Sequence, residues 1–203
     1  NIKINASKVL DAVKERSHFG IGGRTDLITK YKIDEFISQF KHNKFLSDDK
    51  MVEAMTHHLG TQGDGNHFFF VGESEKTGDL TFVTHHGSRK PGALLYKAGM
   101  KIAEAYRKKY SPRTLKQNAW IPYDSEDGAD YWEALQCIRK WTKFNHQIIH
   151  TEVMEELCIE TNNLTDLFWN EHNFVFKRDD LFYHAKGSTP TFQQERTIIP
   201  LNM

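Results

Sequence analysis

A glycine-rich segment at residues 60–72, GTQGDGNHFFFVG, constrains the fold of this chain most strongly. Its glycines allow the backbone to take positive φ values and to approach a ligand closely. The run that follows, residues 68–71, is aromatic and β-branched, which predicts a buried strand. Asn66 and His67 therefore lie immediately before the start of a predicted strand. On this segment alone, His67 is equally well explained as a site residue or as a histidine satisfied in the core.

Two further segments repeat the arrangement of a histidine at the end of a strand. Residues 80–84 form a predicted strand that ends at His85, and His172 precedes a third predicted strand at residues 174–176. Imidazoles supplied from strand ends suit zinc, manganese or iron. His67, His85 and His172 are thus candidate metal ligands, although spacing alone does not distinguish dispersed ligands from dispersed core histidines.

The composition limits the class of protein. The 203 residues are enough for one good-sized domain or two small ones, and 27 basic side chains balance 27 acidic ones. This neutrality argues against a protein that coats nucleic acid by charge alone, but it leaves room for a local basic cleft. No run of about 20 apolar residues predicts a membrane span. Because the sequence begins with Asn and ends in an apparently interrupted strand and turn, we expect a fragment truncated at both ends, without a signal peptide.

Hydrophobic periodicity predicts an α+β fold. A short helix is expected within residues 1–16, with Ser7 as its cap and Val9, Leu10 and Val13 on one face. Two short helices are expected in residues 32–58, with a break near residues 47–49. Longer helices are predicted at about 93–109 and 129–150, packed on a core of strands at about 67–72, 80–85, 173–177 and 181–184.

Several polar or reactive residues remain open to two interpretations. Asn145 and His146, which one helical turn places close together, form either a site pair or, more commonly for such residues, polar surface. His57 and His58 are expected to be solvated residues at a helix end. The two cysteines, Cys137 and Cys158, fit no zinc or disulfide spacing; we expect both to be buried in helices, and a reducing cytoplasm as the compartment.

Basic residues offer candidate phosphate contacts. Arg89 has a planar set of donors suited to a phosphate, although a surface ion pair is the commoner role of an arginine. Lys186 is followed by Gly187 and two hydroxyl side chains that could cradle an anion, without the spacing of a Walker loop. The basic residues 107–109 either meet an RNA backbone or, more often for such a run, form a solvated helix face.

Five motifs in order resemble the RtcB-type RNA ligases: Gly-Thr-x-Gly-x-Gly-Asn-His-Phe, His-x-Gly-Ser-Arg, His-Asn-Phe-Val, His-x-Lys-Gly-Ser-Thr and Ile-Ile-Pro-x-x-Met. The resemblance runs from about residue 17 to the end. A final Pro-Leu-Asn-Met in place of Pro-Gly-Ser-Met is similar to a divergent branch concerned with RNA repair. The resemblance implies an RtcB-like mixed β core with flanking helices, incomplete in this chain, and a single partial catalytic domain over residues 1–203.

The resemblance also implies an activity. Such enzymes are GTP-dependent and use manganese, here two Mn²⁺ ions, to join an RNA 3′-phosphate or 2′,3′-cyclic phosphate to a 5′-hydroxyl. A histidine is first guanylylated, the GMP passes to the RNA 3′-phosphate, and the 5′-hydroxyl displaces it. RNA repair or tRNA splicing in the cytoplasm is the implied role, with RNA carrying these ends as substrate, a possible activating helper protein and no membrane.

Carried over residue by residue, the resemblance assigns the following roles. The metal ligands are His67, His85 and His172; the GTP contacts are Asn66, Asn173 and Asn202; the RNA phosphate contacts are Arg89 and Lys186. The family's Asp-x-x-Cys metal motif is expected upstream of this chain and its guanylylated histidine downstream of Met203, so the chain alone is expected to be inactive. Phe70 stands where the family has a glutamate. A metal-dependent phosphoesterase and a non-catalytic protein that binds RNA ends remain the alternatives.

Overall fold

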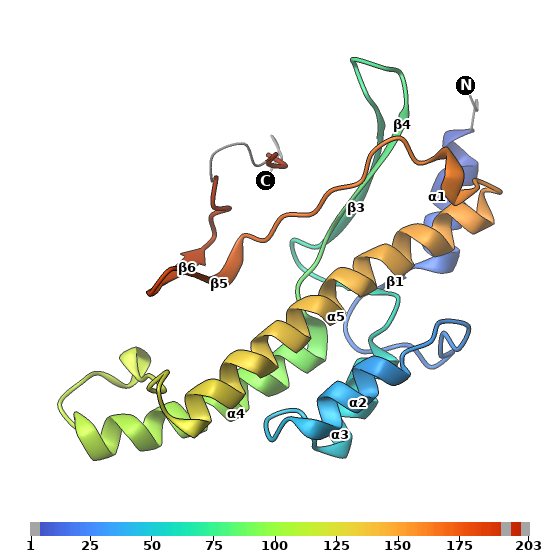
Figure 1. Ribbon diagram of the computed structural model, residues 1–203. Coiled ribbons are helices and arrows are strands. Elements are labelled where there is room, and N and C mark those ends of the chain that lie inside the picture. Colours follow the sequence, from blue (N-terminus) through green and yellow to red (C-terminus); the bar gives the residue numbers. More distant parts are fainter. Residues whose placement is uncertain (1–4, 192–195, 200–203) are drawn as a thin grey trace. The chain divides into compact units, whose positions relative to one another are not determined.

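A computed structural model describes residues 5–191 and 196–199 of the chain (Figure 1). It is α+β, as predicted, and it divides into two compact units, residues 1–159 and 160–203. The expected single partial domain over residues 1–203 stays a prediction. In the part of the chain that the structure describes, no helix has the length and apolar character needed to cross a bilayer.

The first unit contains the α-helices and two small sheets. The helices are α1 (Ala6–Arg16), α2 (Asp34–His42), α3 (Asp49–His57), α4 (Arg89–Tyr110) and α5 (Glu126–Glu156), with a 3₁₀ turn at Lys116–Asn118. The strands are β1 (His18–Phe19), β2 (Thr61–Gly63), β3 (Phe68–Glu73) and β4 (Leu80–His85). The second unit contains a 3₁₀ turn at Thr161–Asn163 and the strands β5 (Asn173–Arg178) and β6 (Leu181–Lys186).

The helices were largely predictable, but several details of their burial and capping were not. The break between α2 and α3 is confirmed, whereas α4 and α5 extend beyond the predicted bounds at both ends. Asn5, rather than Ser7, caps α1, since its side chain accepts a hydrogen bond from the Ser7 N–H. Leu10 is exposed and Ala12 takes its place on the buried face, which Val9 and Val13 complete.

The main hydrophobic core is formed by helices. Trp141 of α5 is fully buried against residues of α2, α3 and α4, among them Phe40, Met55 and Leu95. A second cluster joins α1 to the C-terminal part of α5, and the β3–β4 hairpin packs against it. The sheets of the described residues have two strands each.

Strand β3 is half-buried, so the prediction of a buried strand at residues 68–71 was wrong. Phe70 is 52% exposed, and the only described partner of β3 is β4. The two strands are antiparallel, with Phe68 opposite His85 and Glu73 opposite Leu80. A two-stranded ribbon packs one face and leaves the other open, which explains the exposure of Phe70.

Two other burial predictions were wrong. Cys137 is buried as expected, but Cys158 is exposed, because it follows the end of α5 in a left-handed conformation with φ of 56°. His58 is buried rather than solvated. It follows α3 and leads directly into β2, which is itself buried, so the chain turns inward at this point.

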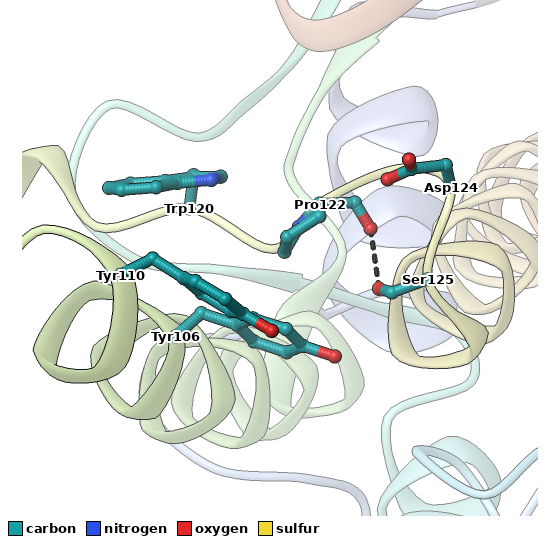
Figure 2. Close-up of a pocket in the computed structure, with 6 residues that line it drawn as sticks. All are labelled: Tyr106, Tyr110, Trp120, Pro122, Asp124 and Ser125. Atoms are coloured by element: carbon teal, nitrogen blue, oxygen red, sulfur yellow. Dashed lines mark hydrogen bonds between the residues drawn. The ribbon is translucent and has the colours of Figure 1, made fainter.

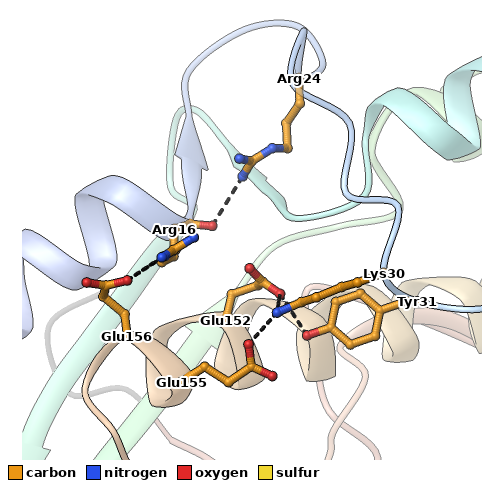
Figure 3. Close-up of polar contacts among 7 residues, drawn as sticks. All are labelled: Arg16, Arg24, Lys30, Tyr31, Glu152, Glu155 and Glu156. Atoms are coloured by element: carbon orange, nitrogen blue, oxygen red, sulfur yellow. Dashed lines mark hydrogen bonds and ion pairs between the residues drawn. The ribbon is translucent and has the colours of Figure 1, made fainter.

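A polar network holds the segment after α1 against the end of α5 (Figure 3). Arg16 pairs with Glu156, and Arg24 donates to the Arg16 carbonyl at 3.2 Å. Lys30 pairs with Glu152 at 2.6 Å and also with Glu155. The segment between these anchors includes β1, which runs parallel to β2 in the glycine-rich loop. The network therefore helps to fix the backbone on which the candidate site is built.

Candidate metal and phosphate site

The pairing of β3 with β4 brings two candidate ligands together. Phe68 is opposite His85, so His67, which directly precedes β3, lies beside the end of β4. The centroids of the His67 and His85 rings are 5.8 Å apart, and the rings are almost perpendicular, at 80°. At metal–nitrogen distances of about 2.0–2.2 Å, two imidazoles on one ion have centroids on the order of 5 Å apart, so the spacing suits a shared ion.

Hydrogen bonds hold both rings in place. His85 Nδ1 lies 3.1 Å from the carbonyl oxygen of Asn66, which only accepts, so this nitrogen carries the proton and the lone pair of the neutral ring is on Nε2. His67 has a donor near each ring nitrogen, since the Gly87 N–H lies 3.3 Å from Nε2 and the Arg89 NH1 lies 3.5 Å from Nδ1. A neutral imidazole accepts at one nitrogen only, so these two donors compete for a single lone pair. A backbone carbonyl that fixes one nitrogen of a ring is the usual second-layer support of a metal-bound histidine.

The electrostatic environment favours the neutral form of His67. Burial, followed by the nearby positive charges of Arg89 and His85, lowers the pKa of His67 below its ordinary value. The Arg89 guanidinium lies 3.5 Å from His67 Nδ1. A neutral imidazole is the form that binds a metal, so the chemistry of this pair fits a divalent ion.

The pair is not a complete metal site by itself. Within residues 5–191 and 196–199, no group of three or more histidine, cysteine, aspartate or glutamate side chains is placed to hold an ion. His172 belongs to the second unit, so its convergence with His67 and His85 stays a prediction. The donor set described here thus supplies two imidazoles, and a Mn²⁺ ion would need further ligands.

Asn145 of α5 links the two segments that carry the histidines. Its side-chain oxygen accepts from the Gly60 N–H at 2.6 Å, and its Nδ2 donates to the Thr61 carbonyl at 3.1 Å and to His86 Nε2 at 3.4 Å. The side chain is fully buried, so the more common interpretation as polar surface was wrong. The other interpretation, that Asn145 faces a site, agrees better with its position, because the side chain lies behind the glycine-rich loop and bonds to it.

A chain of hydrogen bonds fixes the end of β4 on α5. His150 Nε2 lies 3.1 Å from Thr84 Oγ1, and Thr84 Oγ1 lies 2.6 Å from His146 Nδ1. His146 Nε2 in turn lies 3.3 Å from the carbonyl of His86, whose ring stacks on His146 at 3.5 Å. The carbonyl only accepts, so His146 Nε2 donates to it, Thr84 donates to Nδ1, and His150 donates to Thr84. The network is complete with neutral rings.

Burial keeps these rings neutral. Desolvation is the largest effect at each, and it lowers the pKa of His86 to about 3 and that of His150 to about 4. It also lowers the pKa of His146 well below its ordinary value. The sequence alone did not indicate this cluster. The spacing of His146 and His150, four residues apart on one helix, was the available signal, since such residues share a face.

Arg89 occupies a special position at the start of α4. Its φ of 49° is in the left-handed region, which is uncommon for a side chain of this size. Its Nε donates to Thr61 Oγ1 at 3.1 Å, and a Cβ on Gly63 would overlap the guanidinium. Burial lowers the pKa of Arg89. Within the described residues it forms no ion pair, so the surface ion pair is not its role here, and a half-buried cation beside His67 suits an anionic ligand.

The second unit brings three other candidates together. Asn173 is opposite Lys186 in the β5–β6 hairpin, and His172 precedes Asn173. Asn173 Oδ1 accepts from the Gly187 N–H at 2.5 Å, and the His172 carbonyl accepts from the Ser188 N–H at 3.0 Å. The strand ends and the polar turn after Lys186 thus lie side by side. Asn202 lies outside the described residues.

The sequence matches one known protein family over almost its whole length. Residues 3–203 match the family model described as tRNA-splicing ligase RtcB. The relatives include the tRNA-splicing ligases RtcB of Methanocaldococcus jannaschii, 28% identical over 75% of this chain, of Thermococcus kodakarensis, 24% identical over 70%, and of Archaeoglobus fulgidus, 28% identical over 66%. The matched regions are 19%, 35% and 34% of these relatives, so the chain spans about a fifth to a third of their length. This chain belongs to the RtcB family.

Proposed function

We propose that this chain forms part of the catalytic domain of an RNA ligase that uses GTP and manganese. The activity would join an RNA 3′-phosphate or 2′,3′-cyclic phosphate to a 5′-hydroxyl, through a histidine-guanylate and a guanylylated RNA 3′-phosphate. Membership of the RtcB family supports the ligase class, because the relatives are named tRNA-splicing ligases. The observation that carries the proposal is the pair His67 and His85, whose ring centroids lie 5.8 Å apart at the ends of two paired strands.

The proposed role of this pair is to hold manganese together with His172 and ligands from elsewhere in the protein. Bound Mn²⁺ would neutralise charge on the phosphoryl group that is transferred. The chain's own residues then have separate tasks. Asn66 fixes the ring orientation of His85 through its backbone carbonyl.

Arg89 and Lys186 are proposed to bind the RNA phosphate. Arg89 is held by Thr61 and supplies a planar set of donors that is already oriented before the anion arrives. Asn66, Asn173 and Asn202 are proposed to contact GTP. The guanylylated histidine itself is expected outside this chain, in the longer protein.

Ligation by the full-length protein tests the proposal. An RNA ending in a 3′-phosphate and a second RNA with a 5′-hydroxyl are incubated with GTP and MnCl₂, and the products are separated on a denaturing gel. Joined RNA is expected only when GTP and Mn²⁺ are both present, and none with a 3′-hydroxyl RNA. Loss of the 3′-phosphate without joining would instead identify a phosphoesterase. Binding without any chemistry would identify a non-catalytic relative.

A further inference from the structure

A second feature of the first unit is a pocket of about 400 Å³ between the end of α4 and the start of α5 (Figure 2). This size lies within the range of about 300–1,000 Å³ that is usual for small-molecule sites. The pocket is lined by Tyr106, Tyr110, Trp120, Pro122, Asp124 and Ser125. None of these residues belongs to the candidate metal and phosphate site.

Hydrogen bonds and an ion pair hold the walls of the pocket in place. The Tyr106 hydroxyl donates to Asp127 Oδ2 at 3.0 Å, and Asp127 is also paired with Lys44 at 2.5 Å. The Ser125 hydroxyl donates to the Pro122 carbonyl at 2.5 Å and accepts from the first turn of α5. The pocket is therefore formed before any ligand binds, which reduces the entropic cost of binding.

The connection that leads to Trp120 is similarly fixed. Arg107 is paired with Glu104 at 2.7 Å, and its NH1 donates to the carbonyls of Pro112 and Thr114 at 2.8 and 2.7 Å. One arginine thus holds the turn that follows α4. This assigns Arg107 a structural role and distinguishes it from the neighbouring lysines.

Two aromatic side chains in the pocket present their surfaces to solvent. Trp120 is 39% exposed and Tyr110 is 58% exposed, and Figure 2 shows the indole on one side of the pocket and the two tyrosine rings on the other. Tyr106 and Tyr110 are stacked, with centroids 5.9 Å apart. Exposed aromatic faces of this kind stack well on a planar ring, such as a nucleobase.

Basic side chains stand beside the pocket. Residues 104–127 carry five basic and four acidic side chains, and one of the basic ones, Arg107, is paired with Glu104. Lys109 lies 4.9 Å from the centre of the Tyr110 ring, so a cation stands at the edge of the aromatic surface. A stack of aromatic side chains beside basic ones is the usual combination for single-stranded nucleic acid.

We propose that this pocket binds one unpaired base of the RNA substrate, stacked between Trp120 and the tyrosine pair. The inference rests on the proposed function, since it takes RNA as the ligand. Asp124 lines this pocket and makes no hydrogen bond within the part of the chain that the structure describes. Guanine is the expected preference, because its N1–H and N2–H donors are adjacent and match a carboxylate.

The experiment measures the binding of a fluorescent single-stranded 12-nucleotide RNA to the full-length protein by anisotropy, in EDTA and without GTP. These conditions separate base stacking from the metal-dependent chemistry. Trp120→Ala is expected to weaken binding roughly 5- to 100-fold, the range for one stacked base. Trp120→Phe should restore most of the affinity, and Tyr96→Ala, at an aromatic residue of α4 that is 64% exposed outside the pocket, should leave it unchanged.

Abasic substitutions along the RNA locate the bound base. One abasic position should weaken binding to the wild type but should not further weaken binding to Trp120→Ala. At that position, Asp124→Asn should reduce the preference for guanine over uracil. Equal affinities of wild type and Trp120→Ala for intact RNA would overturn the inference. If the protein ligates RNA but wild type and Trp120→Ala bind RNA equally well, the proposed function stands and the pocket assignment is wrong. If Trp120→Ala weakens binding but the protein does not ligate RNA, only the pocket assignment stands.

Discussion

The side-chain oxygen of Asn145 accepts a hydrogen bond of 2.6 Å from the backbone N–H of Gly60. The two residues are 85 positions apart in the sequence. The same carboxamide reaches the Thr61 carbonyl and His86, so one buried side chain of α5 supports the loop that leads to His67 and the residue that follows His85.

Asn145→Ala is expected to destabilise the protein and to weaken manganese binding together. Removal of the carboxamide leaves the buried Gly60 N–H and Thr61 carbonyl without partners, at a cost of about 2–4 kcal/mol including the cavity. Chemical denaturation and Mn²⁺ titration of the full-length protein measure the two effects. Asn163→Ala, at an exposed asparagine, is the control and should change neither. An unaltered Mn²⁺ affinity in Asn145→Ala would show that the residue does not position the ligands.

Two glycines of the same loop offer a matched comparison. Gly63 and Gly65 both have positive φ, at 96° and 72°, so alanine strains the backbone at either position by roughly 1–2 kcal/mol. A Cβ on Gly63 would also overlap the Arg89 guanidinium, whereas a Cβ on Gly65 would meet open space. Gly63→Ala should therefore weaken binding of 3′-phosphorylated RNA more than Gly65→Ala does. Equal affinities of the two variants for this RNA would show that Arg89 does not bind the phosphate.

The polar network at the end of α5 predicts unequal roles for two glutamates. Glu152 is buried, and its Oε1 accepts from Tyr31 at 2.8 Å and pairs with Lys30. Glu152→Ala leaves the Tyr31 hydroxyl without this partner and should cost about 1–3 kcal/mol of stability. Glu155→Ala removes only an exposed pair and should cost less than about 1 kcal/mol. Thermal melts of both variants measure the two losses of stability, and equal losses would contradict the prediction.

Stability should fall as the pH drops below about 6.5. His58 and His150 are buried, and desolvation lowers the pKa of each from 6.5 to about 4. Below pH 6.5 the unfolded chain binds protons that the folded protein does not, so the stabilisation present at neutral pH is lost between pH 6.5 and 4. Each histidine contributes a slope of up to about 1.4 kcal/mol per pH unit.

Non-titrating variants test the origin of this slope. His58→Gln and His150→Gln, the latter of which keeps a donor for Thr84, should each reduce the slope of unfolding free energy against pH between 6.5 and 4. Urea denaturation of the metal-free protein at several pH values gives the slopes. If neither variant alters the slope, the acid sensitivity arises elsewhere.

The sequence predicted the local elements well, because periodicity and turn chemistry are local properties. The break between α2 and α3, the hairpins of β3–β4 and β5–β6, and the placement of His67 and His85 at strand ends all followed from the pattern of residues. The proximity of these two histidines also followed, since neighbouring strands joined by a short turn pair with each other.

Burial and long-range contacts were not predictable in the same way. The roles of Asn145, His146 and His150 depend on how α5 meets a loop and a strand about 60–85 positions away, and helical spacing alone does not specify such a partner. The exposure of Phe70 depended on the number of strands in the sheet, which an apolar run does not reveal. Cys158 was misjudged because α5 ends just before it.

Covalent labelling of the full-length protein by radioactive GTP, in wild type and in His67→Ala, tests the proposed site most directly. A ligand histidine acts mainly through the ion, so its loss should remove charge stabilisation from phosphoryl transfer and leave the fold intact. We predict lost labelling in Mn²⁺ with an unchanged melting temperature in metal-free buffer. Retained labelling at low temperature, with a large drop in the metal-free melting temperature, would show that His67 is a structural residue and would contradict the site assignment.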